Sequence, residues 1–219
     1  MSENRSLRES FTIAAGFAAA ICLIKLVESL LGLDLHFLAL YPRSLDGLQG
    51  VLTAPLVHAS WQHALGNAVP AIGLGGMLIY GYPKSRYVAI PAIWILSGIG
   101  VWLFGRSSYH LGASGLVHGI FFYLFIAGIL RRDARSAALL MVAFYFYGGM
   151  LLTIFPRDPT ISFESHFFGA LAGAGCAWVF RDWDPKPWRR RYSWERSPGE
   201  PLETEEEDPV IGDQWREER

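Results

Sequence analysis

Long apolar runs, separated by short polar or charged segments, occupy most of the chain up to Arg181. A transmembrane helix needs about 20 mostly apolar residues to cross the hydrocarbon layer of a bilayer. Windows of about that length, bounded by charge or turn chemistry, are Phe11–Leu31, Trp61–Tyr82, Tyr87–Phe104, Ser114–Leu130, Ala137–Phe155 and Glu164–Phe180. The pattern predicts an all-α polytopic membrane protein, a bundle of six transmembrane helices.

Composition agrees with this pattern, because 52% of the residues are hydrophobic and only 18% are charged, which is more apolar than an ordinary soluble domain. The net charge of −1 conceals an asymmetry. From Asp182 onward there are 12 acidic and 7 basic residues, against 8 and 12 in the rest of the chain. We therefore predict an N-terminal segment (1–10), a membrane domain (11–181) and an acidic, disordered tail (182–219).

The positions of lysine and arginine between the windows predict the orientation, because cytoplasmic loops are enriched in both. One side of the predicted bundle carries twelve lysine and arginine residues: Arg5, Arg8, Lys84, Arg86, Arg131, Arg132, Arg135, Arg181, Lys186, Arg189, Arg190 and Arg191. The other side carries Arg43, Arg106 and Arg157. Both termini are therefore expected in the cytoplasm, and the chain in the cell membrane.

Several further features are expected to be structural. The outer connection, residues 34–57, mixes apolar residues with turn formers and predicts a structured segment at the membrane interface. Lys25 and Glu28 are one helical turn apart and are expected to pair near the outer end of the first helix. Cys22 and Cys176 lie in apolar runs and are expected to pack there. No Cys/His spacing typical of zinc occurs, so we predict no metal and no cofactor.

Polar residues gather in three places, all on the predicted outer side, where ionisable groups at membrane depth are candidates for function. His63 and Asn67 are four residues apart, so one helix face can aim both side chains at one point, as an oxyanion site requires. Ser114 would stand at the start of its helix, where free backbone N–H groups favour a developing negative charge. Its own N–H is a third candidate donor.

His166, Gly169 and Gly173 place a histidine above a smooth stripe on the last helix, and Gly115 and Gly119 give the fourth helix a matching surface. Small residues let helices approach closely. This pairing predicts that Ser114 and His166 come within hydrogen-bonding distance, which activation of a serine requires. Each feature alone is more often a packing feature, but three polar clusters on one side of the bundle favour a catalytic site.

These motifs resemble those of the rhomboid intramembrane serine proteases, a family with a six-helix core, and the resemblance extends over nearly all of residues 11–181. The HxxxxHxxxN pattern matches His58, His63 and Asn67; GxSG matches Gly112, Ser114 and Gly115; HxxGxxxG matches His166, Gly169 and Gly173.

The resemblance implies that Ser114 is the nucleophile, that His166 is the general base and then the general acid, and that His63, Asn67 and the Ser114 N–H stabilise the oxyanion. His58 would be a structural or water-organising histidine. The family uses a Ser–His dyad without a carboxylate, and Glu164 is expected to point away from His166. Its substrates are transmembrane proteins, cut near the outer membrane face through an acyl-enzyme, with no nucleic acid involved.

Members of this family are thought to admit substrate by movement of the fifth helix. Here that helix carries aromatic residues 144–147 followed by Gly148 and Gly149, a composition that suits either a gate or an aromatic packing stripe.

The sequence departs from the family pattern at two places. The Trp-Arg pair of many members would fall near Gln49 and Gly50 but is missing, and the position four after the serine, commonly tyrosine, is His118. An imidazole there can stack on His166 or act as a second titrating group.

Two alternatives remain: a catalytically inactive rhomboid-like protein that binds membrane clients, and a small transporter or channel. The second predicts polar groups through the full depth of the bundle, whereas here they gather toward one face.

Overall fold

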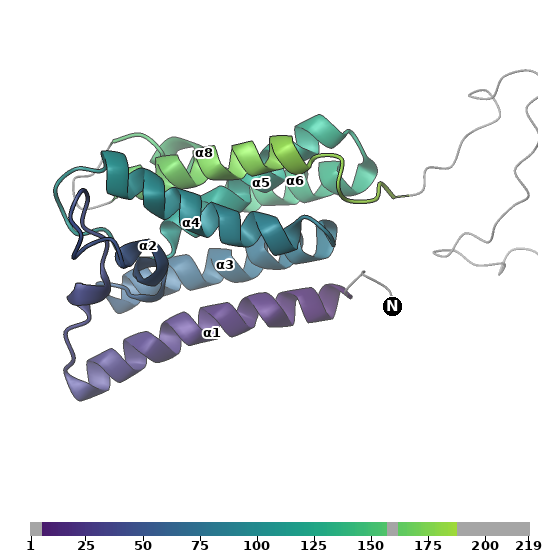
Figure 1. Ribbon diagram of the computed structural model, residues 1–219. Coiled ribbons are helices and arrows are strands. Elements are labelled where there is room, and N and C mark those ends of the chain that lie inside the picture. The colour runs from purple at the N-terminus through teal and green to yellow at the C-terminus, as the bar shows by residue number, and fades with distance from the viewer. Residues whose placement is uncertain (1–5, 157–161, 188–219) are drawn as a thin grey trace, which may run out of the picture. The chain divides into compact units, whose positions relative to one another are not determined.

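The computed structural model describes residues 6–156 and 162–187, and within these ranges the chain is all-helical (Figure 1). The helices are α1 (Leu7–Leu31), η1 (His36–Leu38), α2 (Gly50–Thr53), η2 (Ala54–Leu56), α3 (Trp61–Gly81), α4 (Arg86–Phe104), α5 (Ser114–Arg131), α6 (Ala134–Tyr147), α7 (Met150–Thr153) and α8 (Phe163–Phe180). Four of them, α1, α3, α4 and α5, are long and apolar enough to cross a membrane. The chain is therefore a polytopic membrane protein.

Helix α1 begins earlier than the apolar pattern predicts, because a capping box stabilises its start. The Ser6 hydroxyl accepts a hydrogen bond from the Glu9 N–H, and the Glu9 carboxylate accepts one from the Ser6 N–H. This reciprocal pairing satisfies N–H groups that a helix start otherwise leaves without partners. The first predicted window started at Phe11 because Arg8 and Glu9 interrupt the apolar run.

The last two predicted windows differ from the other four. The window 137–155 is divided into α6, of 14 residues, and the short α7, since the chain leaves the α-helix at Gly148 and Gly149, residues of low helix propensity. Helix α8 has 18 residues, but its first turn contains Glu164, Ser165 and His166, and it is not among the helices apolar enough for a span.

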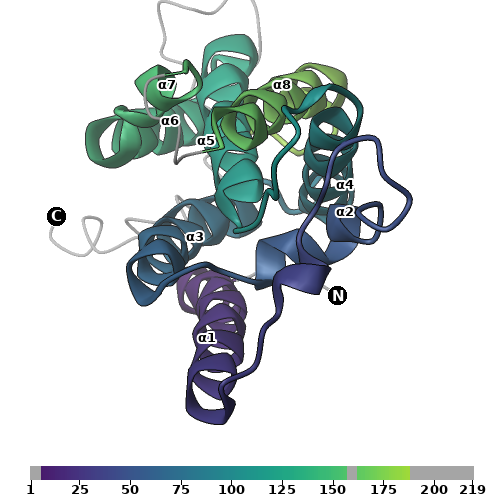
Figure 2. The same ribbon diagram turned by 90° about the vertical axis from the view of Figure 1, so that its left-hand side faces the viewer.

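Helix α5 is the central helix of the bundle. It packs against α3, α4, α6 and α8, whereas α1 packs mainly against α3 (Figure 2). The apolar window of α5 is 72% buried, against 28% for α1 and 22% for α4. Large apolar side chains on α1 and α4, such as Leu30 and Phe104, are exposed at the surface of the bundle. Such outward apolar side chains are expected of helices that contact lipid.

The contact between α5 and α8 is made backbone to backbone. A Cβ atom on Gly169 would collide with the Gly115 carbonyl oxygen, and a Cβ atom on Gly173 would collide with the Gly119 carbonyl oxygen. The predicted glycine contact between these two helices is therefore confirmed. This contact places the first turn of α8 next to the first turn of α5.

The outer connection forms a small structured cap, as predicted. Leu40, Val51 and Ala54 form a buried cluster with Val101 at the end of α4. Leu40 also exchanges two backbone hydrogen bonds with His110, of 2.9 and 2.8 Å, and so links this cap to the loop before α5.

The predicted ion pair of Lys25 and Glu28 is present at 3.1 Å. Lys25 Nζ also donates to the Ala59 carbonyl at 3.4 Å, so the pair links α1 to the segment that leads into α3.

The opposite end of the bundle is held by a buried polar cluster. The Asp184 carboxylate accepts hydrogen bonds from the Ser85 hydroxyl and from the N–H groups of Lys84 and Ser85. Arg131 donates to the backbone carbonyl of Asp184 at 3.1 Å. The beginning of the predicted tail is thus ordered by these contacts. The predicted disorder after residue 187, like the position of residues 1–5, lies outside the described ranges.

The glycine contact between α5 and α8 generates a prediction with an internal control. Gly173→Ala places a methyl group against the Gly119 carbonyl, and overpacking of this kind costs about 1–3 kcal/mol. The apparent melting temperature in detergent should fall by roughly 5 °C. Gly175→Ala, on the same helix with nothing within 4 Å of the added Cβ, should cause no loss. Equal melting temperatures for the two variants would contradict the packing described here.

Candidate active site

A cavity of about 1010 Å³ lies where the beginnings of α3, α5 and α8 meet the end of α6 and the short α7. Its lining contains the predicted nucleophile and base together with the predicted oxyanion donors and the neighbouring histidine: Ser114, His166, His63, Asn67 and His118. These residues come from three separate helices, and the bundle brings them to one surface. The cavity is large enough to hold a short stretch of extended peptide.

Ser114 is the first residue of α5 and is half-exposed. The two residues before it are fixed through their backbone: Gly112 N–H donates to the Ala54 carbonyl at 2.8 Å, and Ala113 N–H donates to His58 Nε2 at 3.2 Å. Gly112 has a φ of 103°, in the left-handed region that favours glycine. The loop therefore holds Ser114 at the start of its helix, the position that the sequence predicted.

The buried His58 accepts a backbone hydrogen bond next to Ser114, a contact that suits the structural one of the two roles suggested for it. Burial, reinforced by the neighbouring His63 imidazole, lowers the pKa of His58 to about 4. At neutral pH the ring is therefore uncharged, and one of its nitrogens is free to accept the hydrogen bond from Ala113. His58 thereby positions the backbone next to Ser114.

His63 and Asn67 both lie against the turn that precedes Ser114. A Cβ atom on Gly112 would come within 2.6 Å of His63 Nε2 and 3.5 Å of Asn67 Nδ2. The missing side chain at Gly112 thus leaves room for these two groups beside the start of α5. The Asn67 amide nitrogen also donates to the His63 carbonyl at 3.1 Å, which restricts its orientation.

His166, in the first turn of α8, is buried. Its Nδ1 lies 3.0 Å from the Thr153 backbone carbonyl. Because a carbonyl only accepts, Nδ1 carries the proton in this contact, and Nε2 keeps the lone pair that a general base needs. No hydrogen bond joins the Ser114 hydroxyl to His166 in the described part of the chain, a looser arrangement than predicted. Catalytic hydrogen bonds are often long before substrate binds.

The rings of His118 and His166 are stacked, with centroids 3.8 Å apart and planes at 10°. One of the two arrangements considered for His118, a stack on His166, is therefore present. His118 Nδ1 lies 2.8 Å from the Ser114 carbonyl, and Nε2 lies 2.7 Å from the Thr153 hydroxyl.

The only acid in the first turn of α8 is turned toward Arg106. Glu164 Oε1 lies 3.5 Å from Arg106 Nε and accepts a hydrogen bond from the Arg106 backbone N–H at 3.3 Å. Within the described residues, no carboxylate is hydrogen-bonded to His166, whose Nδ1 contacts the Thr153 carbonyl instead. The expectation that Glu164 points elsewhere agrees with this geometry.

Comparison with known proteins supports the resemblance to the rhomboid family. The sequence matches the family model described as Rhomboid domain over residues 46–183, which is more than half of the chain. The chain belongs to the rhomboid family. Uncharacterized proteins of Mycobacterium tuberculosis and Mycobacterium bovis are 35% identical to it over 173 residues, which cover 74% of this chain and 72% of theirs. An uncharacterized protein of Mycobacterium leprae is 34% identical, covering 74% and 68%.

The structure explains how this rhomboid accommodates one of its departures from the family pattern. At the place of the missing Trp-Arg pair, a Cβ atom on Gly50 would collide with the backbone of Leu40, so no larger residue fits there in this conformation. The neighbouring Gln49 side chain donates to the Phe37 carbonyl at 2.6 Å. Backbone packing at Gly50 is thus joined by two side-chain hydrogen bonds within the cap, from Gln49 to Phe37 and from Thr53 to the Leu38 carbonyl.

Sequence reasoning missed His110, which couples the loop before Ser114 to the start of α8. Its Nε2 lies 3.1 Å from the Arg106 carbonyl, so Nε2 carries the proton, and Nδ1 accepts from the Ser162 hydroxyl at 2.6 Å. Ser162 in turn caps α8 by accepting from the Ser165 N–H. Burial lowers the pKa of His110, which favours this neutral form. The signal available in the sequence was a histidine two residues before the GxSG motif.

Sequence reasoning also missed Thr153, which contacts both stacked imidazoles. It was the one aliphatic hydroxyl residue in the fifth apolar window.

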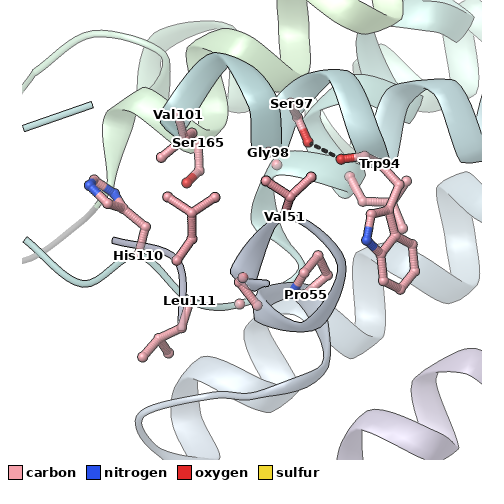
Figure 3. Close-up of a pocket in the computed structure, with 15 residues that line it drawn as sticks. Val51, Pro55, Trp94, Ser97, Gly98, Val101, His110, Leu111 and Ser165 are labelled. Atoms are coloured by element: carbon pink, nitrogen blue, oxygen red, sulfur yellow. Dashed lines mark hydrogen bonds between the residues drawn. The ribbon is translucent and has the colours of Figure 1, made fainter. Parts of the chain in front are cut away.

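A second cavity, of about 30 Å³, lies between the outer cap and α4 (Figure 3). Val51 and Pro55 line it from the cap, Ser97 and Gly98 from α4, and Leu111 from the loop before α5. Its volume is about that of one molecule of liquid water, too small for a peptide segment. The larger cavity is therefore the candidate active site of this rhomboid.

Proposed function

We propose that this rhomboid is an intramembrane serine endopeptidase that cleaves proteins containing transmembrane segments near the outer membrane face. The observation that carries the proposal is the glycine contact of α5 and α8, which places Ser114 and His166 on one cavity together with His63 and Asn67. Membership of a family that consists mostly of intramembrane serine proteases supports the same activity.

In the proposed reaction, Ser114 Oγ attacks the scissile carbonyl carbon while His166 Nε2 takes the serine proton. The negative charge that develops on the carbonyl oxygen is stabilised by His63, Asn67 and the Ser114 N–H. His166 then protonates the leaving amine, and an acyl-enzyme forms. A water molecule, activated by the same histidine, hydrolyses the ester and restores Ser114.

Substrate must present an extended segment to Ser114, because a helical peptide bond is shielded by its own hydrogen bonds and side chains. The side of the cavity formed by α6 and α7 suits such entry. Phe146 and Tyr147 line it, and the Tyr147 hydroxyl lies where a side chain on Gly73 of α3 would stand. An aromatic ring resting on glycine leaves few interlocking side chains to separate, so α6 can move away from α3 at small cost.

We further propose that all six long helices span the membrane, with α6 and α7 together as the fifth span and α8 as the sixth. The polar first turn of α8 then faces the cavity instead of lipid. The distribution of lysine and arginine places both termini in the cytoplasm of the cell and the active site toward the outer face of the cell membrane.

An inactive client-binding protein would need the cavity but not the Ser–His pair. Both residues are present here and share the cavity, which favours the protease. Transmembrane proteins and the surrounding lipid are accordingly the partners we expect.

The proposal predicts that purified wild-type protein, in detergent or liposomes, cleaves a transmembrane substrate near the outer boundary of its membrane segment. Ser114→Ala and His166→Ala should each abolish cleavage, because the first removes the nucleophile and the second its base. Mass spectrometry of the products locates the cleaved bond, and melting temperatures show that the variants are folded. Cleavage by Ser114→Ala would contradict the assignment. Binding without cleavage by wild type would favour the client-binding alternative.

A second prediction tests the oxyanion site. Asn67→Ala should lower kcat by about 10²–10³-fold, since a donor to the transition state is lost, while KM changes far less. Leu65→Ala is a matched control on the same helix, since Leu65 is exposed on the outer surface of the bundle and takes no part in the proposed chemistry. An Asn67→Ala variant with the kcat of wild type would remove Asn67 from the mechanism.

A further inference from the structure

Thr153, the last residue of α7, is bonded to both stacked histidines. Its backbone carbonyl lies 3.0 Å from His166 Nδ1, and its hydroxyl lies 2.7 Å from His118 Nε2. One residue of a four-residue helix therefore contacts the proposed base and the ring that covers it. The mechanism above uses neither Thr153 nor His118.

The acceptors in this network determine where the protons lie. The Ser114 carbonyl only accepts, so His118 Nδ1 donates to it at 2.8 Å, and His118 Nε2 must accept from the Thr153 hydroxyl. The Met150 carbonyl, at 3.1 Å, is a competing acceptor for that single hydroxyl proton, but the contact with His118 is shorter. A neutral His118 in one tautomer therefore satisfies all of its polar neighbours.

A carbonyl group likewise determines where the proton on His166 lies. Its Nδ1–H donates to the Thr153 carbonyl, which leaves Nε2 as the proton acceptor. In a catalytic triad a carboxylate fixes the tautomer of the histidine in this way. Here Glu164, the acid in the first turn of α8, is paired with Arg106, and among the described residues the carbonyl of Thr153 occupies the corresponding place.

We propose, building on the protease function above, that Thr153 and His118 are positioning residues that hold His166 in its proton-accepting tautomer, and that they do so only while α7 is seated against α5 and α8. The stacked His118 ring restrains the plane of His166, and the hydroxyl of Thr153 ties α7 to His118. The carbonyl of Thr153 then faces His166 Nδ1.

The position of α7 is coupled to substrate entry because α7 is directly connected to α6, the helix on the proposed entry side. Helix α7 follows α6 directly after Gly148 and Gly149, and Met150 of α7 lines the active-site cavity together with Tyr147 of α6. Movement of α6 that widens the cavity displaces Thr153. His166 Nδ1–H then loses its acceptor, and the tautomer with a free Nε2 is no longer favoured. Acylation therefore waits for α7 to return against the bound substrate, and the loss of this seating lowers kcat more than it changes KM.

The test uses full-length protein and the transmembrane substrate of the cleavage assay. Thr153→Val has nearly the shape of threonine and keeps the carbonyl but lacks the hydroxyl, whereas Thr153→Ser keeps both groups. His118→Phe keeps a stacked ring and removes both ring nitrogens. We expect Thr153→Val and His118→Phe each to lower kcat by roughly tenfold, with KM within about twofold of wild type, while Thr153→Ser stays close to wild type.

The double variant Thr153→Val/His118→Phe should be no slower than the slower single variant, because both changes break the same hydrogen bond. Melting temperatures separate this effect from unfolding, and Thr153→Ala replaces Thr153→Val if the latter is unstable. A wild-type kcat in both single variants would overturn the inference, as would equal losses in Thr153→Ser and Thr153→Val. Wild-type protein that cleaves nothing would instead overturn the proposed function on which the inference rests.

Discussion

The backbone contact of α5 with α8 is the constraint on which the candidate site depends. Gly169 and Gly173 rest on the carbonyl oxygens of Gly115 and Gly119, and any side chain at these positions would push the helices apart. Ser114 and His166 stand at the ends of these two helices that lie next to each other. A separation by even one methyl group would change the distance between Ser114 and its proposed base, and catalysis is sensitive to displacements of about 1 Å.

The remaining parts of the site are held mostly through backbone groups. The loop before Ser114 is bonded to Leu40, Ala54 and His58, and the proton on His166 is directed by a carbonyl. Buried polar atoms in an apolar bundle need partners, and His58 Nε2, His118 and His166 Nδ1 find theirs in backbone groups and a hydroxyl instead of further charged side chains. A dyad without a carboxylate can thus be oriented in a membrane without the cost of burying an additional ion.

Sequence patterns were sufficient for the elements with strong local signals. Apolar runs located the long helices to within a few residues, and the i, i+3, i+7 spacing of His166, Gly169 and Gly173 identified the helix contact. The break after Tyr147 and the roles of Thr153 and His110 were not predicted. Their partners are distant in sequence, Ser162 for His110 and His118 for Thr153, so no local periodicity reveals them. Gly50 departs from the family pattern, and its close contact with Leu40, which is ten residues away in the sequence, could not be predicted from local periodicity.

The measurement that tests the central claim most directly is the reaction of the purified protein with a fluorophosphonate, which modifies serine hydroxyl groups that a neighbouring base has activated. Peptide mapping by mass spectrometry should find one adduct per chain, on Ser114, and its formation should be lost in His166→Ala. Folded wild-type protein that forms no adduct, or a His166→Ala variant that reacts as fast as wild type, would contradict the claim that His166 activates Ser114.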